Sequence, residues 1–289
     1  MELSLAVDVG ATKLAAGLVD ESGHLAASAV APTPTGAADA DAVFARVAAL
    51  IDAVGGNGEV AVCGVGCGGP MTAGGDAVSP LNIPAWHDFP LRSRLTELTG
   101  LPVFIDNDAK ALALGEGWVG AAVGVADFIA MVVSSGIGGG IVLDGRLLDG
   151  ALGNAGHVGH VIVEPGGRAC ACGGYGCLEA EASGPSIAAI TGRPAAEASS
   201  DVVARTGRLV GRAVASVANL LDLRLAVVAG SVALGFGAPF FAAAQDELDA
   251  RCRLDFSTGA RIVPAGLGAD GPLVGAGAVG WRGMGRLPA

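Results

Sequence analysis

A strand–turn–strand pattern occurs twice in this chain, and it restricts the possible folds more than any other feature. In the first copy, the polar segment 8–13 (DVGATK) joins two short apolar strands, and an acidic turn follows at residues 20–23. In the second copy, the glycine-rich segment 134–140 (SSGIGGG) leads into an apolar strand that ends at the acidic turn 144–145. Two such hairpins more than a hundred residues apart indicate two similar halves.

Strand and helix patterns alternate along the rest of the chain, which is typical of α/β proteins. Apolar residues recur at helical spacing in the segments 40–54, 90–99 and 202–221, and a further helix is expected to start near Asn107. Short apolar runs predict strands at residues 3–9, 13–19, 24–29, 59–65, 101–105, 225–229 and 261–265.

These elements predict two α/β domains around a cleft, residues 1–115 and residues 116–271. A Gly/Ala-rich helix expected at about residues 272–289 would pack back on the first domain. If the two hairpins face each other across the cleft, they can hold the two ends of one polyphosphate.

Charge and hydropathy argue against two classes of partner. The formal net charge is −11, whereas a nucleic-acid surface needs clustered Lys and Arg. The uncharged segment 225–245 is long enough to span a bilayer, but its three glycines and Pro239 divide it into a strand, a loop and a helix start. We therefore expect no nucleic-acid or membrane partner. The chain enters a strand without a signal-peptide pattern, which predicts a cytoplasmic location.

Both hairpin turns combine groups that bind phosphate. Glycines let backbone N–H groups approach a phosphate, a hydroxyl adds a hydrogen bond, and a carboxylate can hold Mg²⁺ through water. Four glycines in five positions of the second turn are more than a simple turn needs, so the pair of turns favours phosphate binding. The candidate residues are Asp8, Gly10, Thr12, Lys13, Ser135, Gly136 and Gly138.

Asp108 is the candidate catalytic base, at an expected strand-to-helix junction in the segment 105–108 (IDND). In the first helical turn the helix dipole favours an ionised carboxylate. Such a carboxylate at a strand end can accept a hydroxyl proton during phosphoryl transfer. Carboxylates in this position are more often helix caps, and the residues alone leave both roles open.

A cluster of metal-ligand residues is the strongest local signal. His160, Cys170, Cys172 and Cys177 lie within eighteen residues, and one histidine with three cysteines is a ligand set of structural zinc. Buried free thiols are the alternative, but three of the six cysteines fall within eight residues. Because four protein ligands leave no open position, we expect the zinc to be structural.

Together these residues resemble the ROK family, a group of bacterial sugar kinases and sugar-responsive repressors, over essentially the whole chain. The segments 8–13 and 135–140 resemble its two phosphate motifs, and residues 107–108 resemble the motif whose second residue is the base. The cysteine and histidine cluster fits its zinc motif. Glu179 fits its following sugar-binding glutamate, and Asn82 in the segment 82–86 (NIPAW) fits a further sugar contact.

The resemblance implies an actin-like ATPase (ribonuclease H-like) fold whose two domains close over ATP and a hexose, commonly in homodimers or homotetramers. Asp108 would take the proton of the sugar 6-hydroxyl, both hairpins would hold the phosphates and Mg²⁺, and Gly230 would lie near the adenosine. The sugar contacts that it implies are Asn82, Asn107, His157, His160 and Glu179. Repressors of the family carry a helix-turn-helix domain before the kinase-like part, and no residues here correspond to one. We therefore expect an enzyme, with a catalytically silent sugar sensor as the alternative.

The segment 156–160 (GHVGH) bears on the substrate. Glucokinases of the family usually have Gly-Glu-x-Gly-His here, whereas bacterial N-acetylmannosamine kinases of the family can carry a histidine at the position of His157. A neutral imidazole suits an acetamido group at the second sugar carbon, because it replaces a group that can only accept hydrogen bonds. We expect phosphorylation of the 6-hydroxyl of N-acetylmannosamine, with glucose as the alternative substrate.

Overall fold

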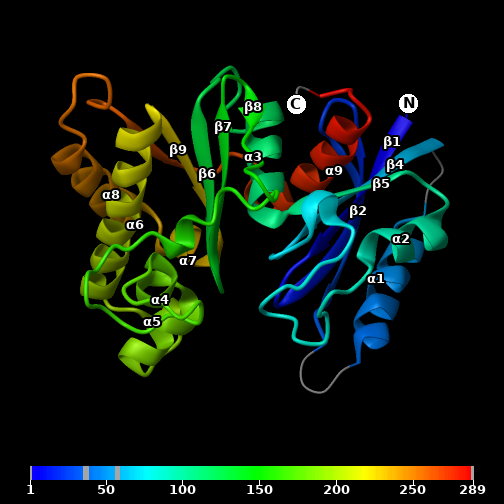
Figure 1. Cartoon of the computed structure of the whole chain (residues 1–289), viewed down its shortest axis with the longest axis horizontal. Coiled ribbons are helices and arrows are strands. Elements are labelled where there is room, and N and C mark those ends of the chain that lie inside the picture. Colours follow the sequence, from blue (N-terminus) through cyan, green and yellow to red (C-terminus); the bar gives the residue numbers. More distant parts are fainter. Residues whose placement is uncertain (1, 35–38, 56–58, 288–289) are drawn as a thin grey trace. The chain divides into compact units, whose positions relative to one another are not determined.

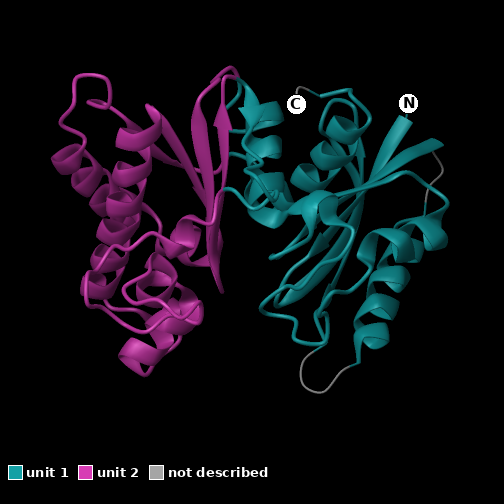
Figure 2. Cartoon of the chain, in the orientation of Figure 1, with its two compact units in different colours: residues 1–123, 145–155, 266–289 teal, residues 124–144, 156–265 magenta. Residues whose placement is uncertain are grey.

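The computed structural model describes residues 2–34, 39–55 and 59–287 (Figure 1). The chain divides into two compact units (Figure 2). Unit 1 consists of residues 1–123, 145–155 and 266–289, and unit 2 consists of residues 124–144 and 156–265. The domain boundary expected at residues 115–116 stays a prediction, and residues 1, 35–38, 56–58 and 288–289 of the predicted ranges lie outside the described residues.

Unit 1 contains a five-stranded sheet with the order β3-β2-β1-β4-β5. Strands β1 and β2, and likewise β2 and β3, pair antiparallel, whereas β1, β4 and β5 are parallel. The carboxyl ends of β1, β4 and β5 therefore meet at one edge of the sheet, where ligands of open α/β sheets usually bind. The strand bounds are β1 (Glu2–Val9), β2 (Lys13–Asp20), β3 (Leu25–Pro32), β4 (Glu59–Cys67) and β5 (Val103–Asn107).

Helices cover both faces of this sheet because alternate residues of each strand point to opposite sides. Helices α1 (Ala40–Val54) and α2 (Leu91–Thr99) share a core with one set of strand residues, including Val7 and Leu14. Helix α9 (Gly271–Gly283) packs on the alternate set, which includes Ala6 and Ala15, and α3 (Asp108–Val119) packs against α9.

The second sheet has the order β10-β9-β6-β7-β8. Strands β6 and β7 form an antiparallel hairpin, and β9 pairs in parallel with both β6 and β10. The strand bounds are β6 (Phe128–Val133), β7 (Ile137–Leu143), β8 (Arg146–Leu147), β9 (Leu225–Ala229) and β10 (Arg261–Pro264). The antiparallel pairing of β1 with β2 and of β6 with β7 confirms both predicted hairpins.

The helices of unit 2 include a long pair, α6 (Ser200–Leu221) and α8 (Ala238–Arg251), which pack closely against each other. Shorter helices follow the segment with the clustered cysteines and the strand β9; they are α4 (Leu178–Ala182), α5 (Gly184–Thr191) and α7 (Ser231–Phe236). Single 3₁₀ turns lie at η1 (Ala73–Gly75), η2 (Val158–His160), η3 (Ala195–Glu197) and η4 (Gly268–Asp270), the first and last of them in unit 1.

The uncharged segment 225–245 begins with the predicted strand, β9, and ends in the predicted helix start, the first half of α8. The expected loop between them is wrong, because the short helix α7 occupies most of it. Throughout the described part of the chain, every helix is too short or too polar to cross a bilayer.

Candidate active site

The parallel strand ends of unit 1 bring two candidate carboxylates to one place. In the register of the sheet, Asp8 of β1 lies opposite Gly66 of β4, and Gly66 lies opposite Asp106 of β5. A Cβ atom on Gly66 would lie 3.6 Å from Cα of Asp108 and 4.0 Å from Oδ1 of Asp8. Asp8 and Asp108 therefore flank the same backbone position at the sheet edge.

Asp8 is buried, and its environment disfavours the ionised form. Burial and, second, the charge of Asp108 raise the pKa of Asp8 to about 7, against the lowering influence of Lys13. A cation beside Asp8 would restore its ionisation, so this carboxylate suits a position next to bound Mg²⁺.

The raised pKa predicts that Asp8→Asn stabilises the protein at high pH when Mg²⁺ and nucleotide are absent. The unfolded chain releases this proton near pH 3.8 and the folded chain only near 7, so the unaltered protein loses stability as the pH rises between these values. Asparagine stays neutral. We expect equal melting temperatures near pH 4 and a variant that melts several degrees higher near pH 8, measured by scanning calorimetry. A lower melting temperature at pH 8 would contradict the burial argument.

The turn between β1 and β2 is held from outside the hairpin. Gly10 N–H donates to the carbonyl of Lys13 at 3.1 Å, and the hydroxyl of Thr33 donates to the carbonyl of Gly10 at 2.7 Å. Thr33 N–H also donates to the carbonyl of Thr12 at 3.1 Å. Thr12 and Lys13 are exposed. The turn is thus fixed through its backbone while these two side chains face solvent.

Asn107 and Asp108 begin α3 in different roles. Asn107 is the N-cap, and its Oδ1 accepts from Ala109 N–H at 3.0 Å. Asp108 is the first helical residue, and its Oδ1 accepts from the same N–H at 2.8 Å. Because Asn107 supplies the cap, capping alone does not require a carboxylate at position 108.

Asn82 lies in an exposed turn of unit 1 whose neighbours anchor it in the core. Ile83 N–H donates to the carbonyl of Pro80 at 2.9 Å, and Trp86 N–H donates to that of Ile83 at 2.9 Å. Ile83 and Trp86 are buried, and the indole of Trp86 stacks on Phe89 at 4.4 Å between ring centroids. The amide side chain is therefore carried on a well-supported turn.

In unit 2, the turn after β6 meets the starts of two helices. The carbonyl of Ser134 accepts a hydrogen bond from Gly184 N–H of α5 at 2.8 Å. The hydroxyl of Ser134 lies 2.9 Å from the hydroxyl of Ser231 in α7. Gly230 precedes α7 with φ +100°, and a Cβ atom there would collide with the backbone of Val133. These contacts bring the predicted residues Ser135, Gly136, Gly138 and Gly230 into one region.

The segment 156–160 is packed against the start of β7 in the same unit. Gly139 N–H donates to the carbonyl of Gly156 at 2.9 Å, and a Cβ atom on Gly156 would collide with the carbonyl of Gly139. Glu179 Oε2 accepts from Ile137 N–H at 2.9 Å. His157 is exposed, and its ring lies 6.2 Å from that of His160 between centroids. One strand thus holds both the glycine-rich turn and the candidate sugar residues His157 and Glu179.

The predicted metal ligands converge in unit 2. The ligand atoms of His160, Cys170, Cys172 and Cys177 all lie within 4.8 Å of one another. Cys172 Sγ lies 3.7 Å from Cys177 Sγ, and Cys170 Sγ lies 3.8 Å from His160 Nδ1. A tetrahedral zinc with Zn–S bonds of about 2.3 Å separates its sulfurs by about 3.8 Å. The four residues therefore fit a closed zinc site.

Comparison with known proteins decides the family. The protein-family model for the ROK family matches residues 4–280. The chain belongs to the ROK family. N-acetylmannosamine kinase of Escherichia fergusonii is 34% identical over 252 residues, which are 81% of this chain and 84% of that protein. Glucokinase of Thermotoga maritima is 40% identical over 185 residues, which are 63% of this chain and 58% of that protein.

Among solved structures, the ROK family glucokinase from Streptomyces griseus, in complex with glucose and AMPPNP, matches with a TM-score of 0.85 at 28% identity. The match covers 97% of this chain and 99% of that chain. These relatives and the two sheets confirm the predicted α/β, actin-like ATPase fold. The chain is a sugar kinase of the ROK family.

A charged cluster beside α3 of this ROK kinase was missed by the sequence predictions. Lys110 of α3 is buried between Asp106 and Asp149, and Arg282 contacts both carboxylates. The spacing of Asp106 and Lys110, four residues apart, was visible in the sequence. Asp149 and Arg282 come from distant segments with no local motif, so nothing in the sequence paired them.

Proposed function

We propose that this ROK kinase transfers the γ-phosphoryl group of Mg-ATP to the 6-hydroxyl of N-acetylmannosamine. The observation that carries the choice of sugar is His157, which stands where glucokinases of the family usually have glutamate and is held through Gly156 against β7. The similarity to N-acetylmannosamine kinases over 81% of the chain supports it. Glucose is the second candidate, because the Thermotoga maritima relative is a glucokinase.

Asp108 would act as the general base in this reaction. Its carboxylate would accept the 6-hydroxyl proton as the sugar oxygen attacks the γ-phosphorus, while the bond from phosphorus to the β–γ bridging oxygen breaks and ADP leaves. The position of Asp108 at the start of α3 favours its ionised form through the helix dipole. Asn107, beside it, would donate from its amide to a sugar hydroxyl.

The two glycine-rich turns would bind the nucleotide. In unit 1, backbone N–H groups around Gly10 and the side chains of Thr12 and Lys13 would contact phosphate oxygens, and Asp8 would hold Mg²⁺ through water. In unit 2, the turn with Ser135, Gly136 and Gly138 would contact phosphate oxygens as well. Gly230 would lie near the adenosine. Bound Mg²⁺ would neutralise the charge that develops on the phosphoryl oxygens.

The sugar contacts would come from polar side chains that the fold already holds in place. Glu179 is fixed by the Ile137 N–H bond to one of its oxygens, so its other oxygen can accept from a sugar hydroxyl. His160 faces the cysteines with Nδ1, so its Nε2 is the nitrogen that would meet the sugar. Asn82 would add an amide contact from unit 1.

A zinc ion bound by His160, Cys170, Cys172 and Cys177 would have a structural role. Four protein ligands complete a tetrahedral shell and leave no position for a reacting water. The ion would hold the loop that carries these ligands next to α4, the helix that contains Glu179.

The direct test is an ADP-release assay with Mg-ATP and a panel of N-acetylmannosamine, glucose, mannose, N-acetylglucosamine and fructose. We expect N-acetylmannosamine to give the highest kcat/KM. Efficient turnover of glucose with none of the acetamido sugar would replace the proposed substrate by glucose. Silence with every sugar, in folded protein that binds one of them by calorimetry, would instead identify a sugar sensor.

Exchange of His157 for glutamate tests whether this residue selects the sugar. We expect His157→Glu to shift the ratio of kcat/KM for N-acetylmannosamine to that for glucose by about 10-fold or more toward glucose, because a buried or mispaired acceptor at one contact changes discrimination by about 1–3 kcal/mol. His87→Glu is the matched control, since the side chains of His87 and of its neighbour Asp88 are both exposed and solvent screens the added charge. An unchanged ratio in His157→Glu would show that this position does not select the sugar.

A further inference from the structure

Lys110 is a cation in an unusual place. Only 2% of its surface is exposed, and it is the third residue of α3, where the helix dipole disfavours positive charge. Its Nζ lies 2.8 Å from Asp106 Oδ1, 2.7 Å from Asp149 Oδ1 and 3.2 Å from the carbonyl of Gly153. An ammonium has three N–H donors, and here each has one oxygen acceptor. The acceptors, and not the helix, account for a lysine at this position.

The ion pair of Lys110 with Asp106 spans the candidate base. Asp106 lies two residues before Asp108 and Lys110 two residues after it, so the pair closes a ring around the first turn of α3. Oδ1 of Asp106 also accepts from Asn107 N–H at 2.8 Å. First turns of helices fray readily because their N–H groups have no partners within the helix. This ring restrains the backbone on both sides of Asp108.

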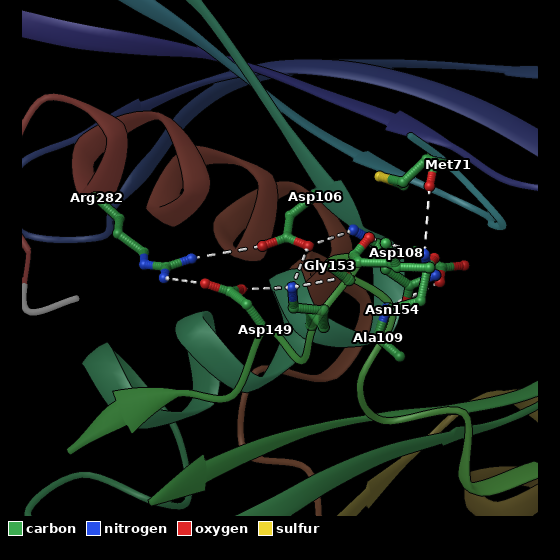
Figure 3. Close-up of polar contacts among 11 residues, drawn as sticks. Met71, Asp106, Asp108, Ala109, Asp149, Gly153, Asn154 and Arg282 are labelled. Carbon is green, nitrogen blue, oxygen red and sulfur yellow. Dashed lines mark hydrogen bonds and ion pairs between the residues drawn. The ribbon is translucent and has the colours of Figure 1, made fainter. Parts of the chain in front are cut away.

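Asp149 and Arg282 extend the ring to two further parts of unit 1. The guanidinium of Arg282 lies 3.5 Å from Asp106 Oδ2 and 3.4 Å from Asp149 Oδ2, so two cations bridge the same two carboxylates (Figure 3). Partial burial of Asp149 opposes its ionisation, but the hydrogen bond and charge of Lys110, with Arg282, leave its pKa below the usual value. Arg282 belongs to α9, and Asp149 to the segment 145–155.

The segment 145–155 has a second attachment within unit 1. Asn154 donates through Nδ2 to the carbonyl of Met71 at 3.3 Å and to that of Leu152 at 3.0 Å. Figure 3 draws Asn154 and Gly153 in the same group of polar contacts as Asp108. Lys110 thus links this segment to α3 through its contacts with Asp149 and Gly153. Gly153 immediately precedes Asn154.

We propose that Lys110 is a positioning residue for turnover: its buried ammonium fixes the first turn of α3 and the segment 145–155 so that Asp108 is held in the geometry of the reaction. This inference rests on the proposed role of Asp108 as the base. Relative to apolar side chains of similar size, a buried ion pair adds little net stability, because desolvation of its charges offsets their attraction, but loss of one partner alone leaves the other charge buried and unpaired. Its effect here is therefore geometric, and misplacement of a reacting group by about 1 Å can lower a rate by about 100-fold.

The test compares Lys110→Met with a control of similar structural cost. Methionine keeps the length and apolar stem of lysine and removes the charge. We expect kcat to fall by about 10-fold to 100-fold while KM for sugar and for ATP changes by less than about 3-fold. The control is Leu50→Ala, in the core between α1 and the face of the sheet that does not contact α9. We expect this control to lower the melting temperature and to leave kcat unchanged at temperatures well below the melting point.

Asp149→Ala provides a second route if Lys110→Met does not fold. The side chain of Asp149 is 52% exposed, so its loss is tolerated more easily. We expect it to lower kcat by about 3-fold to 10-fold, and the double variant with Lys110→Met to lose no more than Lys110→Met alone.

The positioning role would be overturned if folded Lys110→Met kept an unchanged kcat while Asp108→Asn was inactive. If Lys110→Met does not fold, an unchanged kcat in Asp149→Ala would overturn it in the same way. So would equal losses of kcat in Lys110→Met and Leu50→Ala. Full activity of Asp108→Asn would instead show that the assignment of the base is wrong.

Discussion

Asp108→Asn is expected to lower kcat about 1,000-fold, with the affinity for the sugar nearly unchanged. The amide has the shape of the carboxylate and can still accept a hydrogen bond, but it cannot take the hydroxyl proton, and general base catalysis contributes about 100-fold to 10,000-fold. The fold should persist because Asn107 remains to cap α3. Steady-state kinetics by ADP release, with sugar binding by calorimetry, measure the two quantities separately.

The matched control is Asp52→Asn, which makes the same change at an exposed position of α1, the helix on the other face of the sheet. It should leave kcat and sugar affinity as they are. If Asp108→Asn keeps kcat within tenfold of the unaltered protein, another group takes the proton and the first residue of α3 has only a binding role.

Cys172→Ser is expected to abolish zinc binding and to inactivate the enzyme. Metal analysis of the unaltered protein should find about one zinc ion per chain, and the variant should retain almost none, because a serine hydroxyl is a far poorer zinc ligand than a thiolate. Cys172 is exposed, so the substitution itself disturbs little packing. The loop that carries His160 should then loosen, which would lower sugar affinity and the melting temperature together.

Cys252→Ser separates loss of metal from loss of a buried thiol. Cys252 is buried at the end of α8 and is not one of the four clustered residues, so this variant should lose some stability and keep its zinc. An unaltered protein without stoichiometric metal would show that the four residues form a hydrogen-bonded thiol cluster instead.

Local patterns predicted most of the fold. Helix α1 has the predicted bounds because its apolar stripe is continuous and Asp39 caps it, with Oδ1 accepting from Ala42 N–H at 2.8 Å. Strand β5 was predicted two residues too early, at 101–105. The apolar run stops before Asp106, but pairing with β4 continues through Asp106 and Asn107, and Pro102 has no N–H to donate. This strand end carries polar residues, which a hydrophobic pattern does not mark as strand.

The candidate site was predictable where its residues are close in sequence. The cysteine and histidine cluster lies within one short segment, and the structure brings its ligand atoms together. Whether Asp108 caps its helix or faces a substrate could not be read from the residues, and the structure adds that Asn107 supplies the cap. The contacts of Lys110 with Asp149 depend on a tertiary arrangement that brings α3 against the segment 145–155. No spacing in the sequence encodes such a pair.

The attachment of Glu179 to Ile137 has a consequence for how the two substrates communicate. If Glu179 binds the sugar as proposed, a sugar that orders its carboxylate would also steady the backbone of β7 at the turn proposed to hold phosphate. Binding free energies coupled through one strand are coupled equally in both directions. Bound sugar should therefore raise the affinity for nucleotide by the same factor as bound nucleotide raises the affinity for sugar. A kinase coupled in this way would hold ATP more weakly before its acceptor binds, which would limit hydrolysis of ATP by water.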